Sequence, residues 1–64
     1  MIDVVFELDR DTKRTRRFAE VSAVIHGDET PAPVVGTLYV QQWALKQINE
    51  GELPEKVTVT IKVG

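Results

Sequence analysis

The densest group of side chains that could do chemistry is a basic cluster between residues 10 and 17. It holds five of the eight basic residues of the chain, with Asp11 as the only acid, so this stretch carries a formal +4 and the remainder −6. Arginine and lysine bind phosphate and carboxylate groups. Charge sorted in this way predicts a surface that prefers anionic partners. The members of this basic cluster are Arg10, Lys13, Arg14, Arg16 and Arg17.

The residues needed for catalysis are scarce. There is no cysteine, and Ser22 and His26 are the only serine and histidine, with no motif around either. A nucleophilic serine needs a histidine at its hydroxyl and a third group behind that histidine, which this spacing does not arrange. His26 with Asp28 and Glu29 is a weak ligand set for zinc, and no glycine-rich phosphate loop is present. We therefore expect no enzyme, no catalytic residues, no metal site and no cofactor.

The aromatic residues are few, and the residues around each in the sequence indicate whether it is buried or exposed. Phe6 shares a face with Ile2, Val4 and Leu8 and is expected in the core. Trp43 lies in an amphipathic pattern, which indicates a core position or the anchor of a dimer interface. Tyr39 lies on the polar side of its segment. It is the best exposed candidate and joins the basic cluster as an expected binding residue.

Length and composition limit the architecture. The 64 residues form one domain, 1–64, with a small core that disulfides cannot reinforce. Association is the remaining simple route to stability, so we expect a homodimer. No apolar stretch approaches the ~18 residues of a membrane helix, and no basic leader precedes an apolar run. The expected location is the cytoplasm, without membrane contact.

Alternating residues predict a strand at the N-terminus, over Ile2–Leu8, followed by a polar turn. Residues 16–25 fit either a strand or a helix, and their β-branched content favours a strand. The basic cluster then lies at the tip of a hairpin. His26–Pro33 has no period and is expected to be a loop, and Val34–Gln41 is expected to be the third strand.

The period changes over Gln42–Glu50, which predicts a short helix ending near Gly51. Val57–Val63 alternates cleanly, which predicts a final strand with Ile61 buried. The fold class is α+β, mainly β: a small, mostly antiparallel four-stranded sheet with one short helix, in the order strand, strand, strand, helix, strand. Pairing of the first and last strands at the centre of the sheet is favoured.

Three phrases carry a resemblance: ELDRDTKRTRRFAEV at 7–21, VVGTLYVQQWAL at 34–45 and PEKVTVTI at 54–61. They resemble short uncharacterised bacterial and phage-associated β-rich proteins with a closing V-T-V-T-I strand, for which the resemblance implies no activity. The order of elements in TLYVQQWALKQINEGELPEKVTV is also similar to swapped-hairpin antitoxin-type transcription factors, which dimerise.

These features together predict a non-enzymatic binding module that uses the basic hairpin tip. The alternative is a solvated turn whose charges balance Asp3, Glu7 and Glu20 across the sheet through surface ion pairs. If the turn is a binding surface, two partners remain open. One is nucleic acid, with the protein as a small regulator, because β-ribbons can contact a groove or a phosphate backbone. The other is an acidic patch on a protein, bound by a phage- or plasmid-type modulator. The sequence pI of about 5.2 and the acidic remainder of the chain weigh against nucleic acid.

Overall fold

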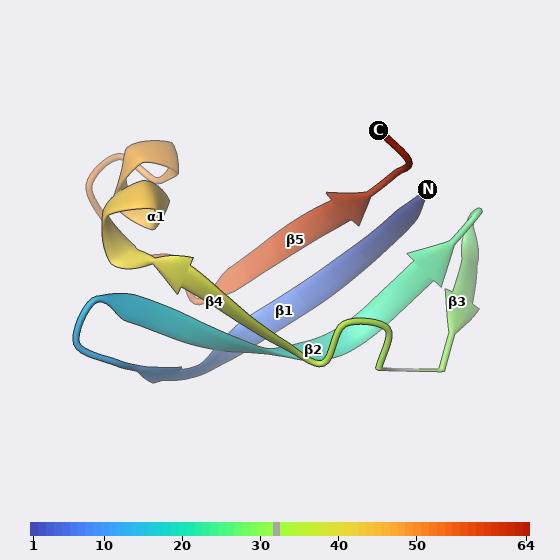
Figure 1. Ribbon diagram of the computed structural model, residues 1–64, viewed down its shortest axis with the longest axis horizontal. Helices are drawn as coiled ribbons and strands as arrows, with labels where there is room; N and C mark the ends of the chain where they lie inside the picture. Colours follow the sequence, from blue (N-terminus) through green and yellow to red (C-terminus); the bar gives the residue numbers. More distant parts are fainter. Residues whose placement is uncertain (32) are drawn as a thin grey trace.

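The computed structural model describes residues 1–31 and 33–64. Its main feature is a long antiparallel hairpin of β1 (Ile2–Asp11) and β2 (Thr15–Ile25), drawn in blue to cyan in Figure 1. Alternation in β1 places Val4 and Phe6 inside, where both are fully buried. The predicted first strand and hairpin are confirmed, and residues 16–25 form a strand and not a helix.

Two irregularities in the hairpin register change which side chains face inward. Val5 pairs with Ser22 but Phe6 pairs with Glu20, so Val21 has no partner on β1. An extra residue of this kind shifts the alternation of its strand. Phe18 and Ala23 are consequently both buried, although uninterrupted alternation would put them on opposite faces. The alternation of β2 is therefore interrupted at Val21.

The sheet has five strands and not four. Its order is β3-β2-β1-β5, and β4 (Thr37–Gln41) pairs with the first half of β2. The additional strand is β3 (Asp28–Thr30), which lies within the segment expected to be a loop. His26 and Gly27 have φ of 52° and 87°, and two consecutive residues with positive φ form the tight turn that suits a two-residue hairpin. The expected loop over residues 26–33 is thus replaced by a hairpin over its first half; Ala32 lies outside the described residues.

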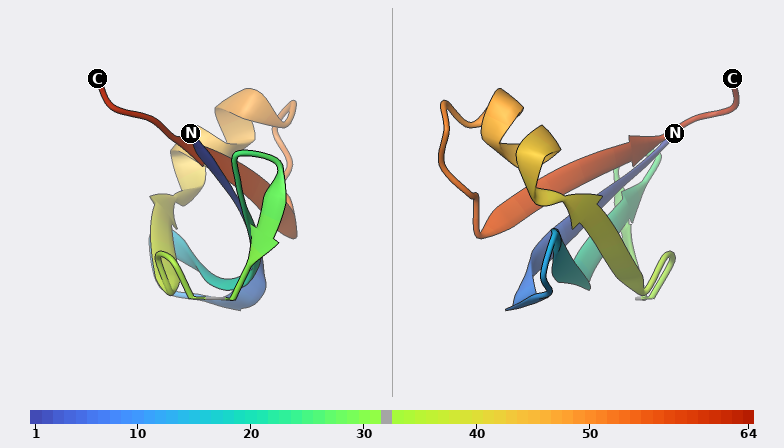
Figure 2. Two further views of the ribbon diagram at one scale, coloured as in Figure 1. Left: turned by 90° about the vertical axis from the view of Figure 1, so that its right-hand side faces the viewer. Right: turned by 60° about the vertical axis from the view of Figure 1, so that its left-hand side comes forward.

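The sheet curls, and α1 (Gln42–Ile48) lies over the opening between β4 and β5 (Lys56–Ile61), as Figure 2 shows. Leu45 is the buried residue of this helix and is 2% exposed. It completes a core contributed by β1, β2 and α1. The buried apolar residues are Val4, Phe6, Phe18, Ala23 and Leu45.

The helix differs from its prediction in length and in orientation. It ends at Ile48 and not at Glu50. The chain then turns through Glu50 and Gly51, both with positive φ, and the Gly51 N–H donates to the Lys46 carbonyl at 2.8 Å. Trp43 is 68% exposed, so the expectation that it belongs to the core is wrong. With only seven residues, the helix inserts one large side chain, and Leu45 takes that place.

β5 pairs antiparallel with β1, as expected, but forms an edge of the sheet while β1 lies inside it. Val57 and Val59 pack against the core. Ile61 is 40% exposed, so its expected burial is wrong. The strand ends at Ile61 and not at Val63, which is fully exposed, although the alternation of the sequence continues. α1 is too short and too polar to cross a membrane, and no other helix occurs in the described ranges.

Candidate functional site

The tip of the β1–β2 hairpin holds Lys13 and Arg14 outside the sheet. The Thr12 N–H donates to the Thr15 carbonyl at 2.9 Å, which closes the turn around these two residues. The Thr12 hydroxyl also lies within hydrogen-bonding distance of the Thr15 carbonyl. Short polar side chains that bond to nearby backbone are typical of turns. The two cations are therefore on a backbone held at both ends and are exposed to solvent.

The start of α1 is fastened to this tip by Gln42. Its backbone N–H donates to the Arg14 carbonyl at 2.9 Å. Its side-chain amide donates to the carbonyls of Thr12 and Thr15 at 3.1 and 3.2 Å. Three hydrogen bonds from one residue fix the spacing between turn and helix, which are about 30 residues apart in the sequence. The relative position of their side chains is thus determined by the fold.

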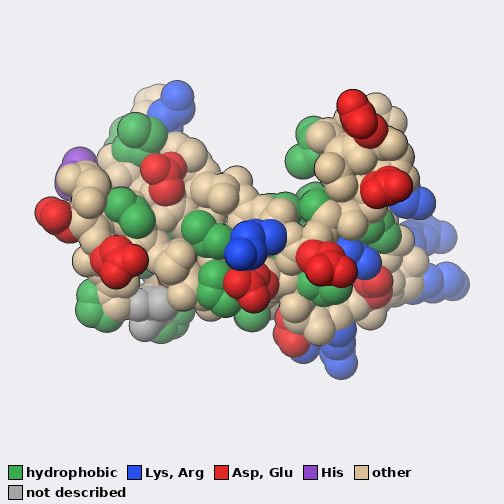
Figure 3. Space-filling model, turned by 180° about the vertical axis from the view of Figure 1, so that it is seen from behind, with side chains coloured by type: hydrophobic (Ala, Val, Ile, Leu, Met, Phe, Trp, Pro, Cys, Tyr) green, Lys and Arg blue, Asp and Glu red, His purple; other side chains and the backbone are tan. Residues whose placement is uncertain are grey.

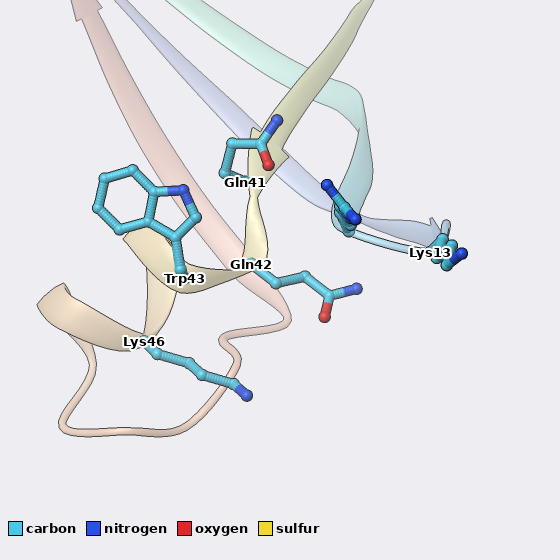
Figure 4. A pocket seen from close by; sticks show the side chains of 6 residues that line it. Lys13, Gln41, Gln42, Trp43 and Lys46 are labelled. Atoms are coloured by element: carbon cyan, nitrogen blue, oxygen red, sulfur yellow. The ribbon is translucent and has the colours of Figure 1, made fainter.

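Between the turn and the helix lies an open groove of about 440 Å³. Figure 4 shows Gln42 and Lys46 extending from the helix towards the hairpin tip, with the indole ring of Trp43 on the other side of the helix start, beside Gln41. Lys46 follows Gln42 by four residues and therefore lies on the same side of the helix. The residues lining the groove are Lys13, Arg14, Gln41, Gln42, Trp43 and Lys46.

The groove is cationic. Across residues 1–31 and 33–64, no carboxylate forms a salt bridge with Lys13, Arg14 or Lys46. Figure 3 shows several Lys and Arg side chains projecting at one end of the molecule, with acidic side chains both at that end and along the rest of the face. Ammonium and guanidinium groups that lack an internal partner can donate charge-assisted hydrogen bonds to a phosphate or a carboxylate.

Arg16 belongs to the predicted binding residues, but it has a different environment. Its guanidinium donates to both carboxylate oxygens of Asp11, at 2.7 and 2.9 Å, and to the Pro54 carbonyl at 3.0 Å. The residue is 9% exposed. The hydrogen bonds and charge of Arg16 lower the pKa of the Asp11 carboxyl. Arg16 thus connects the hairpin to the segment that leads into β5.

Arg17 lies on the outer face of the sheet in a row with Arg10 and Tyr39, its register partners on β1 and β4. Its guanidinium contacts the Asp9 carboxylate at 2.6 Å. Asp9 is the extra residue at the second register shift, between Leu8 and Arg10. Tyr39 is 57% exposed, which confirms its expected position on the polar side of the strand. Part of the expected cluster is therefore neutralised within the sheet.

Glu20 positions the start of β4. Its carboxylate accepts hydrogen bonds from the backbone N–H groups of Val34, Val35 and Gly36 at 2.7, 2.6 and 2.8 Å. Desolvation acts to raise the pKa of Glu20, but these three donors outweigh it and the pKa is lowered. The Glu20 N–H in turn donates to the Gly36 carbonyl at 3.0 Å. This contact aligns β4 along β2 and so places Gln41 and Trp43 at the groove.

The structure brings Lys13 and Arg14 together with four residues that sequence reasoning did not include. Lys46 and Gln42 could have been linked by their four-residue spacing, but the sequence carries no signal that the helix lies against the hairpin tip. No group of three or more potential metal ligands occurs within the residues described here. Comparisons with protein-family models, curated proteins and solved structures found no match to this chain.

Proposed function

We propose that the protein is a non-enzymatic binding module whose groove contacts the phosphate backbone of a nucleic acid. The observation that carries this proposal is the convergence of three cations from two elements, Lys13, Arg14 and Lys46, on one open groove. Phosphates recur along a nucleic-acid strand, so separate cations can each contact one of them. The amide of Gln41, which also lines the groove, adds a neutral donor for phosphate or sugar oxygens.

The surroundings of the groove favour nucleic acid over an acidic protein patch. Trp43 and Tyr39 are both exposed, at 68% and 57%; Trp43 lines the groove, and Tyr39 precedes the groove residue Gln41 by two positions on β4. Aromatic rings beside basic side chains are typical of surfaces that bind unpaired bases. The formal charge of the whole chain is −2, so attraction at long range is weak and affinity must come from local contacts. We therefore expect binding that falls steeply with added salt.

The test is fluorescence anisotropy of labelled oligonucleotides, both single-stranded and duplex, over a series of salt concentrations. The triple variant Lys13→Gln/Arg14→Gln/Lys46→Gln removes three phosphate contacts. It should flatten the slope of log K against log salt by ~2.7 for a duplex or ~2.1 for a single strand. Melting should stay near that of the wild type, because surface charges remote from the core usually change stability by under about 0.5 kcal/mol.

A matched control separates the groove from a general effect of net charge. Lys62→Gln removes one positive charge outside the groove, and Arg14→Gln removes one inside it. Only Arg14→Gln should weaken binding. Equal effects of the two variants, or no oligonucleotide binding at all, would contradict the proposal. Binding of polyglutamate that oligonucleotides do not displace would instead favour the acidic patch of a protein partner.

The homodimer expected from the sequence remains a proposal of its own. In the described sheet, β5 pairs only with β1, so one of its edges is available to a second chain. Exposed Ile61 is the last residue of β5, and exposed Val63 follows it by two residues. Sedimentation at micromolar concentration should give a dimer mass, and a monomer mass with full thermal cooperativity would contradict it.

A further inference from the structure

We infer that the ligand of the groove is single-stranded nucleic acid, with a base stacked on Trp43 at the groove rim. This inference rests on the proposed function and adds the strandedness of the ligand and the residue that recognises it. The cations of Lys13, Arg14 and Lys46 account for contacts to phosphates. They do not account for the large exposed aromatic ring of Trp43, which also lines the groove.

Trp43 is not needed by the core. Leu45, two residues later, is 2% exposed and supplies the buried contact of α1, while Trp43 is 68% exposed. Gln42 independently fixes the start of the helix to the hairpin tip. The indole is therefore held on a rigid backbone with much of its surface open to solvent. Such a ring can stack on a flat partner with little loss of conformational entropy.

A second exposed ring continues the same surface. Tyr39 and Gln41 are two residues apart on β4, so both point to the outer face, about 7 Å apart along the strand. Gln41 lines the groove, and Tyr39 lies opposite Arg17. The order along the chain is thus ring, amide, ring. An amide between two rings can hydrogen-bond to base edges while the rings contact base faces.

The preference for a single strand over a duplex follows from which part of a base a protein ring can contact. In a duplex the faces of the bases are covered by their neighbours, so a protein ring can reach a face only after a base has been unstacked. In a single strand the faces are accessible, and each stacked base contributes without regard to its identity. A surface with two exposed rings and three unpaired cations therefore matches a single strand with little sequence preference.

The experiment uses the intrinsic fluorescence of the protein, because Trp43 is its only tryptophan. Titration with oligo-dT, oligo-rU and a mixed duplex should quench this fluorescence with the two single strands at concentrations where the duplex has little effect. The DNA and RNA arms distinguish the two sources of the same chemistry. Quenching should track the binding isotherm that anisotropy gives for the labelled strand.

Substitution then tests the ring itself. Trp43→Ala should weaken single-strand binding by about 5- to 150-fold, and Trp43→Phe should retain most of the affinity. Ile48→Ala is the matched control, because Ile48 is an exposed apolar residue of the same helix, 77% exposed, that does not line the groove. Ile48→Ala should bind a single strand like the wild type. All three variants should have melting temperatures near that of the wild type.

The outcomes separate this inference from the proposed function. Duplex and single strand binding equally, or Trp43→Ala binding a single strand like the wild type, would overturn the inference. If Arg14→Gln still weakened binding in that case, the proposed function would stand with a different ligand form. Absence of binding to every oligonucleotide would overturn both.

Discussion

The basic cluster has a turn part, Lys13 and Arg14, and a strand part, Arg16 and Arg17 on β2, and the two parts differ in what surrounds each charge. Arg16 on β2 is 9% exposed and is bound by Asp11 and by the Pro54 carbonyl. Arg14, two residues earlier, is exposed and lines the groove. A charge with an internal partner holds elements together, whereas a charge without one is available to a ligand. The comparison teaches that a run of like residues can contain a buried arginine in a structural ion pair beside exposed charges that have no internal partner in the described structure.

The largest expected effect comes from the core beneath the strand part. Phe18 lies on the same face of β2 as Arg16 and is fully buried. Phe18→Ala should lower the free energy of unfolding by about 3–5 kcal/mol, which is much of the stability of a small domain. Urea denaturation would measure the change. Ile61→Ala is the control. Because Ile61 is 40% exposed, it should cost only about 1 kcal/mol, and equal losses would contradict the burial described here.

The next prediction tests the contacts of Arg16 with Asp11 and the Pro54 carbonyl. Arg16→Gln leaves the Asp11 carboxylate and the Pro54 carbonyl without their donor, and should lower the free energy of unfolding by about 1–3 kcal/mol. Thermal melting should shift downward accordingly, while Arg14→Gln melts like the wild type. A melting temperature of Arg16→Gln equal to that of Arg14→Gln would remove the distinction between the two parts of the cluster.

Acid should weaken the contacts made by the carboxylates of Asp11 and Glu20. The pKa values of Asp11 and Glu20 are lowered in the folded protein, so both carboxylates bind protons more readily in the unfolded chain. Their contribution to stability is fully present above the unfolded values, near 4, and is lost as pH falls through the lower folded values. Denaturant midpoints measured from pH 6 to pH 2 should decline in that window. Glu20→Gln should decline less, and an unchanged slope would contradict this assignment.

The smallest expected effect belongs to the turn. Arg14→Gln should change the free energy of unfolding by under about 0.5 kcal/mol. The same variant should weaken oligonucleotide binding measurably, because it removes one phosphate contact. Denaturation and anisotropy on one preparation would check both statements. A clear loss of stability would show that Arg14, like Arg16, holds structural elements together.

Much of the architecture could be predicted because local pattern carried it. Alternation over residues 2–8 and 57–63 predicted strands that the structure confirms, the second ending at Ile61, and the helix predicted over residues 42–50 is present but ends at Ile48. Two of the failures share a cause. Val21 shifts the alternation of β2, and His26 with Gly27 forms so short a turn that the pattern of residues 26–33 resembles a loop. In each case one or two residues changed the geometry without changing the composition of the segment.

The sequence by itself determined four of the five strands and the helix, the small size of the core and the location of most basic residues in one hairpin. Periodicity and charge are properties of neighbouring residues, so they can be read without knowing the fold. Only the tertiary structure decided which charges are free and that Trp43 is exposed. Pairing of Arg16 with Asp11, and placement of Lys46 opposite Lys13 and Arg14, depend on bulges, on the curl of the sheet and on the hydrogen bonds of Gln42. Those contacts join residues far apart in the chain, where no local pattern reports them.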